Sequence, residues 1–438
     1  MGKSARQIAY EILLKIEVDE AYSNLAIDGA VKVHNPDSTD CAFISRLVYG
    51  VVERKITLDY LISQYLSKPI KKTKPEVLTI LRLGAYQLVF MDKVPQSAAV
   101  NESVKLTKAN KCDYAAGLVN AVLRKISQNG LNTENIADEV EKISVTYSVP
   151  AELVNFLTYH YGKENAEGIF NAALQPKAVF VRVNTLKTTT DELRALLKQE
   201  GVEVHSTFMA DALRLELNSA VYDLKCFKVG LFHVEDLSSQ LCVEALELKP
   251  DFTAIDVCAA PGGKSFTAAQ YMQNKGTLYS CDIYSQRTDL IKEGAERLGA
   301  TCIKPFVNDA TVFNDSLPQM DRVLCDVPCS GLGIIGKKPE IKYKRLDDTK
   351  SLLPIQRQIL EISSKYVKQG GRLVYSTCSI NPNENRKICD AFLKANPDFE
   401  SVKVLPQVER AVDEGNYLTL LPHKNNCDGF FIAAFVRK

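Results

Sequence analysis

In the first third of the chain, apolar residues recur every three or four positions, which is the spacing of an amphipathic helix. Ile8, Ile12 and Ile16 share one such face near the amino terminus. The same period returns in four further segments, at residues 47–66, 76–90, 98–109 and 114–126. Polar or proline-bearing turns separate them. Residues 1–130 are therefore expected to form an all-helical domain, and the pattern leaves open whether it binds RNA, binds protein or braces the rest of the chain.

The pattern changes over residues 131–235. A short helix precedes an apolar run, and then a helix and two short strands follow, at residues 151–161, 179–184, 190–199, 202–204 and 213–217. This β-α-β-β order predicts a small α+β domain with helices on one face of a sheet, as in RNA-recognition modules. Because the strands lack the aromatic-rich signature with which such modules stack bases, a domain that merely positions its neighbours is an equally good interpretation.

From residue 236 to the end, strands alternate with helices. The predicted strands lie at residues 253–257, 276–281, 302–307, 322–325, 372–375 and 429–436. Such alternation predicts a mostly parallel, doubly wound α/β sheet. The chain is thus expected to hold three domains, with boundaries near residues 130 and 235, which also suits its length of 438 residues.

Composition indicates an ordinary globular protein, with 46% hydrophobic and 24% charged residues. No stretch approaches the roughly 18 uninterrupted apolar residues of a membrane span, and the amino terminus has no signal-peptide core, so a cytoplasmic protein is expected. The net charge of +1 does not point to nucleic acid. The lysine clusters at residues 68–74, 105–111 and 337–345 are stronger evidence than the net charge for a phosphate-bearing partner. A solvated lysine face would also explain any one of these clusters.

The spacing of the twelve cysteines decides what they mean. None forms a C-x-x-C pair and the five histidines are scattered, so no metal site is expected. Four of the cysteines, Cys258, Cys281, Cys302 and Cys325, lie in or beside apolar strand-like segments, where a cysteine is usually a small buried hydrophobe. Cys329 and Cys378 differ, because each follows a predicted strand in a turn of small residues, and two neighbouring strands would deliver both thiols to the ligand-binding edge of the sheet.

The turn after the first strand of this region runs from Cys258 to Lys264 and is rich in proline and glycine, so its backbone can approach a ligand closely. It matches neither phosphate-binding glycine motif, which favours a nucleoside without phosphate. Asp282 ends the next strand, where a carboxylate can accept ribose hydroxyls, and Asp309 ends the third. A single acid at a strand end often caps the following helix instead.

Asp326 and Cys329 lie three residues apart in a proline-stiffened turn. Cys378 ends its strand before a predicted helix amino terminus, which would stabilise a thiolate and so activate the sulfur. A disulfide between the two cysteines is the rival interpretation, and a cytosolic location disfavours it.

Five of these segments resemble the RsmB/Sun (Fmu) family of RNA 5-methylcytosine methyltransferases: DVCAAPGGKS, DVPCSGLG, LVYSTCSINPNEN, DGFFIAAF and, in the helical region, LRLGAYQLVFMDKVPQSAAVNESV. The last is similar to the NusB-like domain of the bacterial members. The resemblance covers nearly the whole chain, and its paired proline-cysteine and threonine-cysteine motifs are specific, since DNA cytosine methyltransferases carry only the first. It implies a NusB-like helical domain, an RRM-like middle domain and a Rossmann-like class I methyltransferase domain.

The resemblance also implies a reaction. S-adenosylmethionine would be the cofactor, and Cys378 would attack C6 of a cytosine, Asp326 would hold or protonate N3, and Cys329 would assist removal of the C5 proton. The implied cofactor site comprises Cys258, Ala259, Ala260, Pro261, Gly262, Gly263, Lys264, Asp282, Arg287, Asp309 and Asp326. The substrate would be cytosine 967, in the usual numbering, of 16S rRNA before or early in small-subunit assembly, and the enzyme a monomer.

Three alternatives remain at this point. A nicotinamide-dependent oxidoreductase could use the same sheet, but the glycine fingerprint and a placed His or Tyr proton donor are missing. The helical region could belong to a non-catalytic protein that binds RNA or an antitermination factor. The methyltransferase could also act on another site in rRNA or tRNA.

Overall fold

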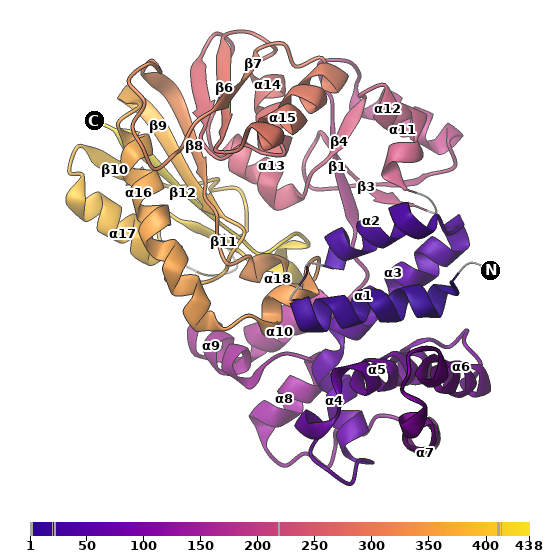
Figure 1. Ribbon diagram of the computed structural model, residues 1–438. Helices are drawn as coiled ribbons and strands as arrows, with labels where there is room; N and C mark the ends of the chain where they lie inside the picture. Colours follow the sequence, from indigo (N-terminus) through magenta and orange to yellow (C-terminus); the bar gives the residue numbers. More distant parts are fainter. Residues whose placement is uncertain (1–2, 20, 22, 218–219, 410–411, 413) are drawn as a thin grey trace. The chain divides into compact units, whose positions relative to one another are not determined.

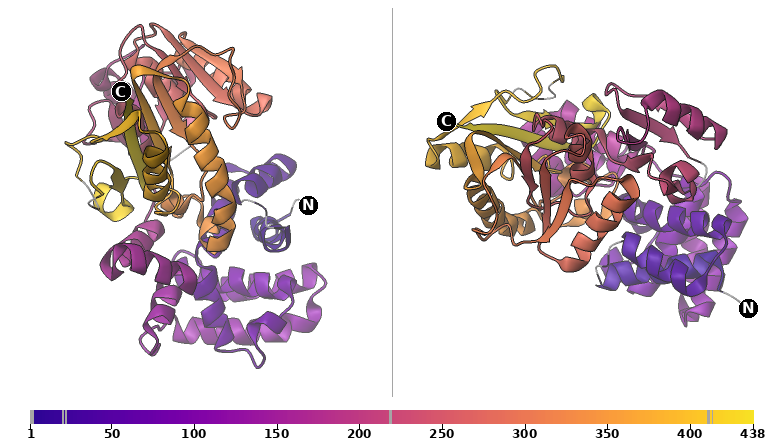
Figure 2. Two further views of the ribbon diagram at one scale, coloured as in Figure 1. Left: turned by 90° about the vertical axis from the view of Figure 1, so that its left-hand side faces the viewer. Right: turned by 90° about the horizontal axis from the view of Figure 1, so that it is seen from above.

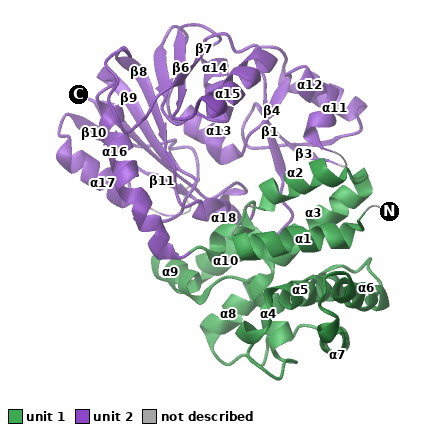
Figure 3. Ribbon diagram, viewed as in Figure 1, with its two compact units in different colours: residues 1–174, 337–344 green, residues 175–336, 345–438 purple. Residues whose placement is uncertain are grey.

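The computed structural model describes residues 3–19, 21, 23–217, 220–409, 412 and 414–438 (Figure 1). The chain divides into two compact units (Figure 3). Unit 1 holds residues 1–174 and the short segment Lys337–Lys344, and unit 2 holds residues 175–336 and 345–438. The domain boundaries at residues 130 and 235 stay predictions. Within the described residues, no helix is long and apolar enough to cross a membrane.

Unit 1 is helical, as the sequence predicts. Its helices are α1 (Ala5–Asp19), α2 (Ser23–His34), α3 (Ser38–Glu53), α4 (Lys55–Ser63), α5 (Pro75–Phe90), α6 (Gln96–Ala109), α7 (Ala116–Asn129), α8 (Glu139–Tyr147), α9 (Ala151–Tyr161) and α10 (Lys163–Leu174). Helix α5 is central, since every residue from Val77 to Gln87 is buried. The core that surrounds it is built from the apolar faces of α1, α3, α4 and α7.

The helix expected over residues 47–66 is two helices, α3 and α4, that meet at Arg54. The reason is a contact from far along the chain. Ser148 Oγ accepts hydrogen bonds from the backbone N–H groups of Ile56 (2.9 Å) and Thr57 (3.4 Å). These are first-turn donors of α4 that no helical carbonyl can satisfy, so the break is stabilised by a residue that local periodicity does not reveal.

The segment Lys337–Lys344 completes unit 1, although the chain on both sides of it belongs to unit 2. It forms the 3-10 turn η5 (Pro339–Tyr343). Lys342 Nζ donates to the carbonyl of Glu53 (2.6 Å) and the Tyr343 hydroxyl to that of Val52 (2.8 Å), which are terminal carbonyls of α3. Lys342 is therefore buried, and its expected place on a basic surface patch is wrong.

Unit 2 begins with a small antiparallel sheet in the order β2-β3-β1-β4. Its strands are β1 (Val179–Val183), β2 (Glu203–Ser206), β3 (Ala212–Glu216) and β4 (Phe232–Val234), joined by α11 (Thr190–Gln199) and α12 (Lys225–Lys228). Thr189 and Glu192 form a reciprocal capping box that starts α11. Leu193 and Leu197 of that helix pack on the sheet. The predicted β-α-β-β order is confirmed, and β4 is a further strand that the sequence pattern did not reveal.

The large sheet has the order β10-β12-β9-β8-β5-β6-β7, with β11 paired to β12. Its strands are β5 (Thr253–Asp256), β6 (Thr277–Asp282), β7 (Ile303–Val307), β8 (Met320–Asp326), β9 (Val367–Thr377), β10 (Phe399–Val402), β11 (Leu418–Leu420) and β12 (Phe430–Arg437). Strands β5 to β9 pair in parallel, as predicted. The carboxyl-terminal strands add an antiparallel edge, so the sheet is mixed.

Helices cover both faces of this sheet (Figures 1 and 2). They are α13 (Leu237–Glu244), α14 (Gly263–Tyr271), α15 (Ser285–Leu298), α16 (Leu352–Ser364) and α17 (Arg386–Ala395), and α18 (Pro422–Asn425) is a short turn near the end. Side chains of the strands alternate between two cores: Ala254 and Leu324 pack with α13, α14 and α15, whereas Ile255 and Val323 pack with α16 and α17. The strand order reverses between β5 and β8, and such a switch point is where an open α/β sheet binds its ligand.

Candidate active site

The turn after β5 brings the backbone close to its surroundings. Gly262 has a φ of 114°, and a Cβ there would lie 2.4 Å from the Phe266 ring. Helix α14 begins at the next residue. A side chain at Gly263 would likewise come to 3.2 Å from the buried carboxylate of Glu235. Both glycines therefore let the turn pack closely against Phe266 and Glu235. The close approach to a ligand that the sequence suggested for this turn stays a prediction.

Asp282 and Arg287 lie together beside this turn. Arg287 pairs with Asp282 Oδ2 (3.2 Å) and donates to the carbonyl of Ala260 (2.9 Å), so it links the end of β6 to the turn after β5. Asp309 follows β7, and its Oδ1 accepts from the backbone N–H and the hydroxyl of Thr311. That contact closes a local turn. The helix-capping role given as the alternative for such acids does not apply to Asp309, because no helix lies between β7 and β8 among the described residues.

Asp326 ends β8 and is held from two sides. Lys264 Nζ donates to its Oδ2 (2.7 Å) and the hydroxyl of Ser376, at the end of β9, donates to its Oδ1 (2.8 Å). Burial by itself would lower the pKa of Lys264, but the charge of Asp326 outweighs it and keeps that pKa above its usual range. The ion pair joins the turn after β5 to the turn that carries Cys329.

The two cysteines singled out in the sequence meet. Asp326 and Ser376 are paired residues of β8 and β9, and Cys329 and Cys378 follow them by three and two positions. Their Sγ atoms are 3.0 Å apart. Both are free thiols and both are partly exposed, so neither is sealed in the core. A hydrogen bond with Cys378, together with burial, raises the pKa of Cys329 well above its usual range.

The expected helix amino terminus beside Cys378 is wrong, because α17 begins only at Arg386. Residues 379–385 form a loop instead, folded by side-chain hydrogen bonds. Asn385 Nδ2 donates to the carbonyl of Ser379 (2.8 Å), and the hydroxyl of Thr377 donates to Asn385 Oδ1 (2.6 Å). These polar contacts delay the helix, and periodicity does not predict them.

The structure also reveals residues that sequence reasoning missed. Ser376 binds Asp326, while Glu384 and Gln356 bind backbone and side-chain groups beside the two cysteines. Each is a common polar residue type, in a strand (Ser376), a loop (Glu384) or a helix (Gln356), so a single sequence gives no signal for it. Glu384 falls within a motif that carries the family resemblance, and that was the one available hint.

The other strand cysteines behave as predicted. Cys281 and Cys325 are buried, and burial raises the pKa of each thiol to about 12. Cys258 lies in the turn after β5, and burial raises its pKa well above the usual value. These thiols stay protonated near neutral pH, which agrees with a packing role.

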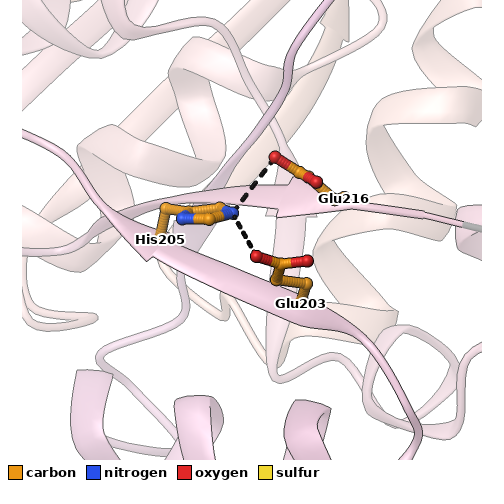
Figure 4. Close-up of side chains that lie close together, drawn as sticks. All are labelled: Glu203, His205 and Glu216. Carbon is orange, nitrogen blue, oxygen red and sulfur yellow. Dashed lines mark ion pairs between the residues drawn. The ribbon is translucent and has the colours of Figure 1, made fainter.

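One cluster in the small sheet has the composition of a metal site (Figure 4). Glu203 and Glu216 are cross-strand partners on β2 and β3, and His205 Nε2 lies 3.3 and 3.2 Å from their carboxylates. Arg214 also pairs with Glu216 (3.1 Å). Like charges opposite one another destabilise a sheet, and the Arg214–Glu216 ion pair reduces that repulsion on the exposed hairpin.

Comparison with known proteins identifies the family. Residues 243–436 match the model of the 16S rRNA methyltransferase RsmB/F, residues 3–128 match the NusB family, and residues 149–222 match the RsmF/B-like ferredoxin-like domain. The chain is 39% identical to the probable ribosomal RNA small subunit methyltransferase B of Bacillus subtilis, over 99% of both proteins. The chain belongs to the RsmB/F family of rRNA methyltransferases.

Further similarities agree with this membership. Ribosomal RNA small subunit methyltransferase B of Pasteurella multocida is 32% identical, over 98% of this chain and 95% of that protein. The crystal structure of PH0851 covers all of both chains with a TM-score of 0.83 at 26% identity. The predicted NusB-like and methyltransferase domains are thereby confirmed, and the small α+β middle domain, expected to be RRM-like, matches the ferredoxin-like model. The oxidoreductase alternative is wrong.

Proposed function

We propose that this protein methylates C5 of a cytosine in 16S rRNA through a transient covalent bond between Cys378 Sγ and C6 of the base. The observation that carries this proposal is the pair of free thiols 3.0 Å apart at the ends of β8 and β9. A carbon atom of a pyrimidine is a poor nucleophile, so its methylation needs a covalent activation that nitrogen or oxygen methylation does not. The thiols of Cys329 and Cys378 and the carboxylate of Asp326, at the ends of the neighbouring strands β8 and β9, could supply that activation.

The residues present fit the adenosylmethionine cofactor that the methyltransferase family uses. The turn after β5 lies beside the switch point of the sheet, Asp282 ends β6, and Asp309 follows β7. Buried Asp256 has an Oδ1 without a hydrogen-bond partner in the structure. The residues proposed to hold the cofactor are Cys258, Ala259, Ala260, Pro261, Gly262, Gly263, Lys264, Asp282, Arg287, Asp309 and Asp326. S-adenosylmethionine, when bound, supplies the methyl group.

In the proposed reaction Cys378 acts first. Its thiolate bonds to C6, the ring loses its aromaticity, and electron density moves to C5 and toward N3. The Asp326 carboxylate, which accepts hydrogen bonds from Lys264 and Ser376, would hold N3 as charge builds there or, after taking up a proton from solvent, would protonate it. The base must leave its stack to reach these groups.

Cys329 acts last. After C5 has gained its methyl group, the Cys329 thiolate takes the remaining C5 proton. The electrons of that C–H bond re-form the C5–C6 double bond, and the bond between C6 and Cys378 Sγ breaks. The Cys329 thiol must first lose its own proton. In the adduct Cys378 Sγ is bonded to C6, so burial is the cause that still raises the pKa of Cys329, and loss of the proton is favoured as pH rises.

Substitution of each cysteine tests the proposal. Cys378→Ala should abolish methyl transfer, whereas Cys329→Ala should trap a covalent enzyme–RNA adduct, seen as a shifted band on a denaturing gel. The double variant should form no adduct. Cys41→Ser, in α3 of unit 1, is the matched control and should behave as the unaltered protein. Normal turnover by Cys329→Ala would refute the division of roles, and activity of Cys378→Ala would refute the covalent mechanism.

The proposed target is cytosine 967 of 16S rRNA, methylated in the cytoplasm before or early in small-subunit assembly by a monomer. Mapping 5-methylcytosine in the RNA of a strain that lacks the gene tests this. Loss of the mark at that position supports the assignment. Loss at another rRNA or tRNA site would correct the substrate, and loss at no site would leave a non-catalytic RNA-binding protein as the better explanation.

A further inference from the structure

One buried carboxylate holds both cysteine loops. Glu384 is fully buried, and its two oxygens accept hydrogen bonds from the residues that directly follow the cysteines. Oε1 accepts from the backbone N–H of Ser330 (2.7 Å), and Oε2 accepts from the hydroxyls of Ser330 and Ser379 (2.7 Å for Ser379). The two hydroxyls are themselves 2.9 Å apart.

A third element reaches the same carboxylate. Gln356 of α16 donates to Oε1 of Glu384 (3.0 Å) and to the carbonyl of Pro328 (2.9 Å), the residue before Cys329. Glu384 and Gln356 thus bind the backbone on both sides of Cys329. The hydroxyl of Tyr375 in β9 donates to the carbonyl of Glu384 (2.7 Å), which fixes the position of Glu384 against the strand that leads to Cys378.

The buried Glu384 carboxylate stabilises the two loops only if all of its hydrogen bonds are formed. A buried carboxylate is costly unless its lone pairs are satisfied, and here four donors from three segments satisfy them. Hydrogen bonds to an ionised acceptor are about twice as strong as neutral ones. Such a fully satisfied buried network gives one rigid arrangement of its parts. Its parts are the loops whose sulfurs are 3.0 Å apart.

We propose that Glu384 is a positioning residue for methyl transfer: by binding Ser330 and Ser379, it sets the Cys329 sulfur at the place from which it can reach the C5 proton of a base bonded to Cys378. This inference rests on the proposed function, because it concerns the division of work between the two thiols. Glu384 itself takes no part in bond making. Misplacement of a reacting group by about 1 Å costs about 100-fold in rate, so loss of Glu384 should impair proton removal most.

The experiment uses Glu384→Gln and Glu384→Ala in the full chain, with RNA substrate and S-adenosylmethionine. Glu384→Ala should slow turnover about 100-fold and should accumulate the enzyme–RNA adduct, because Cys378 still attacks while Cys329 is displaced. Glu384→Gln keeps the shape and one acceptor, and should recover part of the rate. In a Cys329→Ala background, Glu384→Gln should add little, since the thiol to be positioned is already gone.

Two further comparisons separate positioning from mere folding. Glu414→Ala removes a half-buried carboxylate of the same unit that accepts a hydrogen bond from Thr419 of β11, and should leave turnover and adduct unchanged. Should Glu384→Ala fail to fold, Ser330→Ala and Ser379→Ala remove the donors singly and should each accumulate some adduct. An adduct trapped by Cys329→Ala but by none of these variants would overturn the positioning role and leave the proposed function standing. Absence of adduct in Cys329→Ala together with active Cys378→Ala would instead overturn the proposed function.

Discussion

Replacing Lys264 by methionine would remove the positive charge that neutralises Asp326 between the turn after β5 and the Cys329 turn. The two groups are 2.7 Å apart, with side chains 14% and 25% exposed. Unit charges about 4 Å apart attract by about 4 kcal/mol at an effective dielectric constant of about 20. Removing one partner of a buried pair costs about 3–5 kcal/mol, because the other charge stays buried and unpaired. We expect about 3 kcal/mol, since a quarter of the Asp326 side chain is exposed.

Calorimetry of the full chain measures this effect in the transition of unit 2. In a unit of this size, about 1 kcal/mol shifts Tm by about 2–4 °C, so Lys264→Met should lower that Tm by about 6–12 °C. Lys368→Met is the matched control, because it breaks a more exposed pair with Asp321 in the same unit (2.8 Å, Lys368 41% exposed) and should cost less than about 1 kcal/mol.

A second substitution isolates the pairwise energy. Asp326→Asn in the Lys264→Met background removes the stranded charge and should recover most of the lost Tm, with a coupling energy of about 2–3 kcal/mol. A shift below about 2 °C in the single variant would show that the pair does not hold the two turns together. The same conclusion would follow if the two substitutions simply added.

Three shorter predictions follow from other residues. Because the Cys329 thiol must lose its proton before it acts as a base, decay of the enzyme–RNA adduct should accelerate as pH rises from about 6.5 to about 8.5, by up to tenfold per pH unit. A flat profile in rapid-quench gels would contradict its role as base. Burial raises the pKa of Asp256 from 3.8 to about 7, so the stability that the protonated carboxyl contributes is complete below about pH 4 and is lost as pH rises through 7. Asp256→Asn should remove this dependence and flatten the plot of Tm against pH in that window. The corresponding change in the free energy of unfolding is at most about 4 kcal/mol. Gly333→Ala places a Cβ 1.8 Å from the carbonyl oxygen of Gly429 and should lower both Tm and turnover, whereas Gly117→Ala meets nothing within 4 Å and should stabilise α7 by about 0.5–1 kcal/mol in the same melting assay.

Much of the fold follows from local pattern. The 3.6-residue period located α1, α5, α6 and α7, and alternation of strands with helices predicted the doubly wound sheet. The errors have non-local causes. The break between α3 and α4 depends on Ser148, which lies more than ninety residues away in sequence, and the antiparallel edge depends on β12 returning between β9 and β10.

Part of the candidate site could likewise be predicted from the sequence. Cys329 and Cys378 could be paired from sequence, because parallel neighbouring strands carry their carboxyl ends to one edge. Glu384 could not, since its role depends on four donors that only the folded loops bring together. The expected activation of Cys378 by a helix terminus failed for the same reason, because side-chain contacts of Asn385 displace the start of α17.

The return of residues 337–344 to the helical unit has a consequence for how the protein can be dissected. A fragment beginning at Gln175 would retain Lys342 and Tyr343 but would remove the Glu53 and Val52 carbonyls that they bind. Both side chains, which follow Cys329 by thirteen and fourteen residues, would then lose these hydrogen-bond partners. Residues 1–174 therefore cannot be removed without disturbing the segment 337–344. Loss of activity in such a fragment would not by itself show that residues 1–174 recognise RNA.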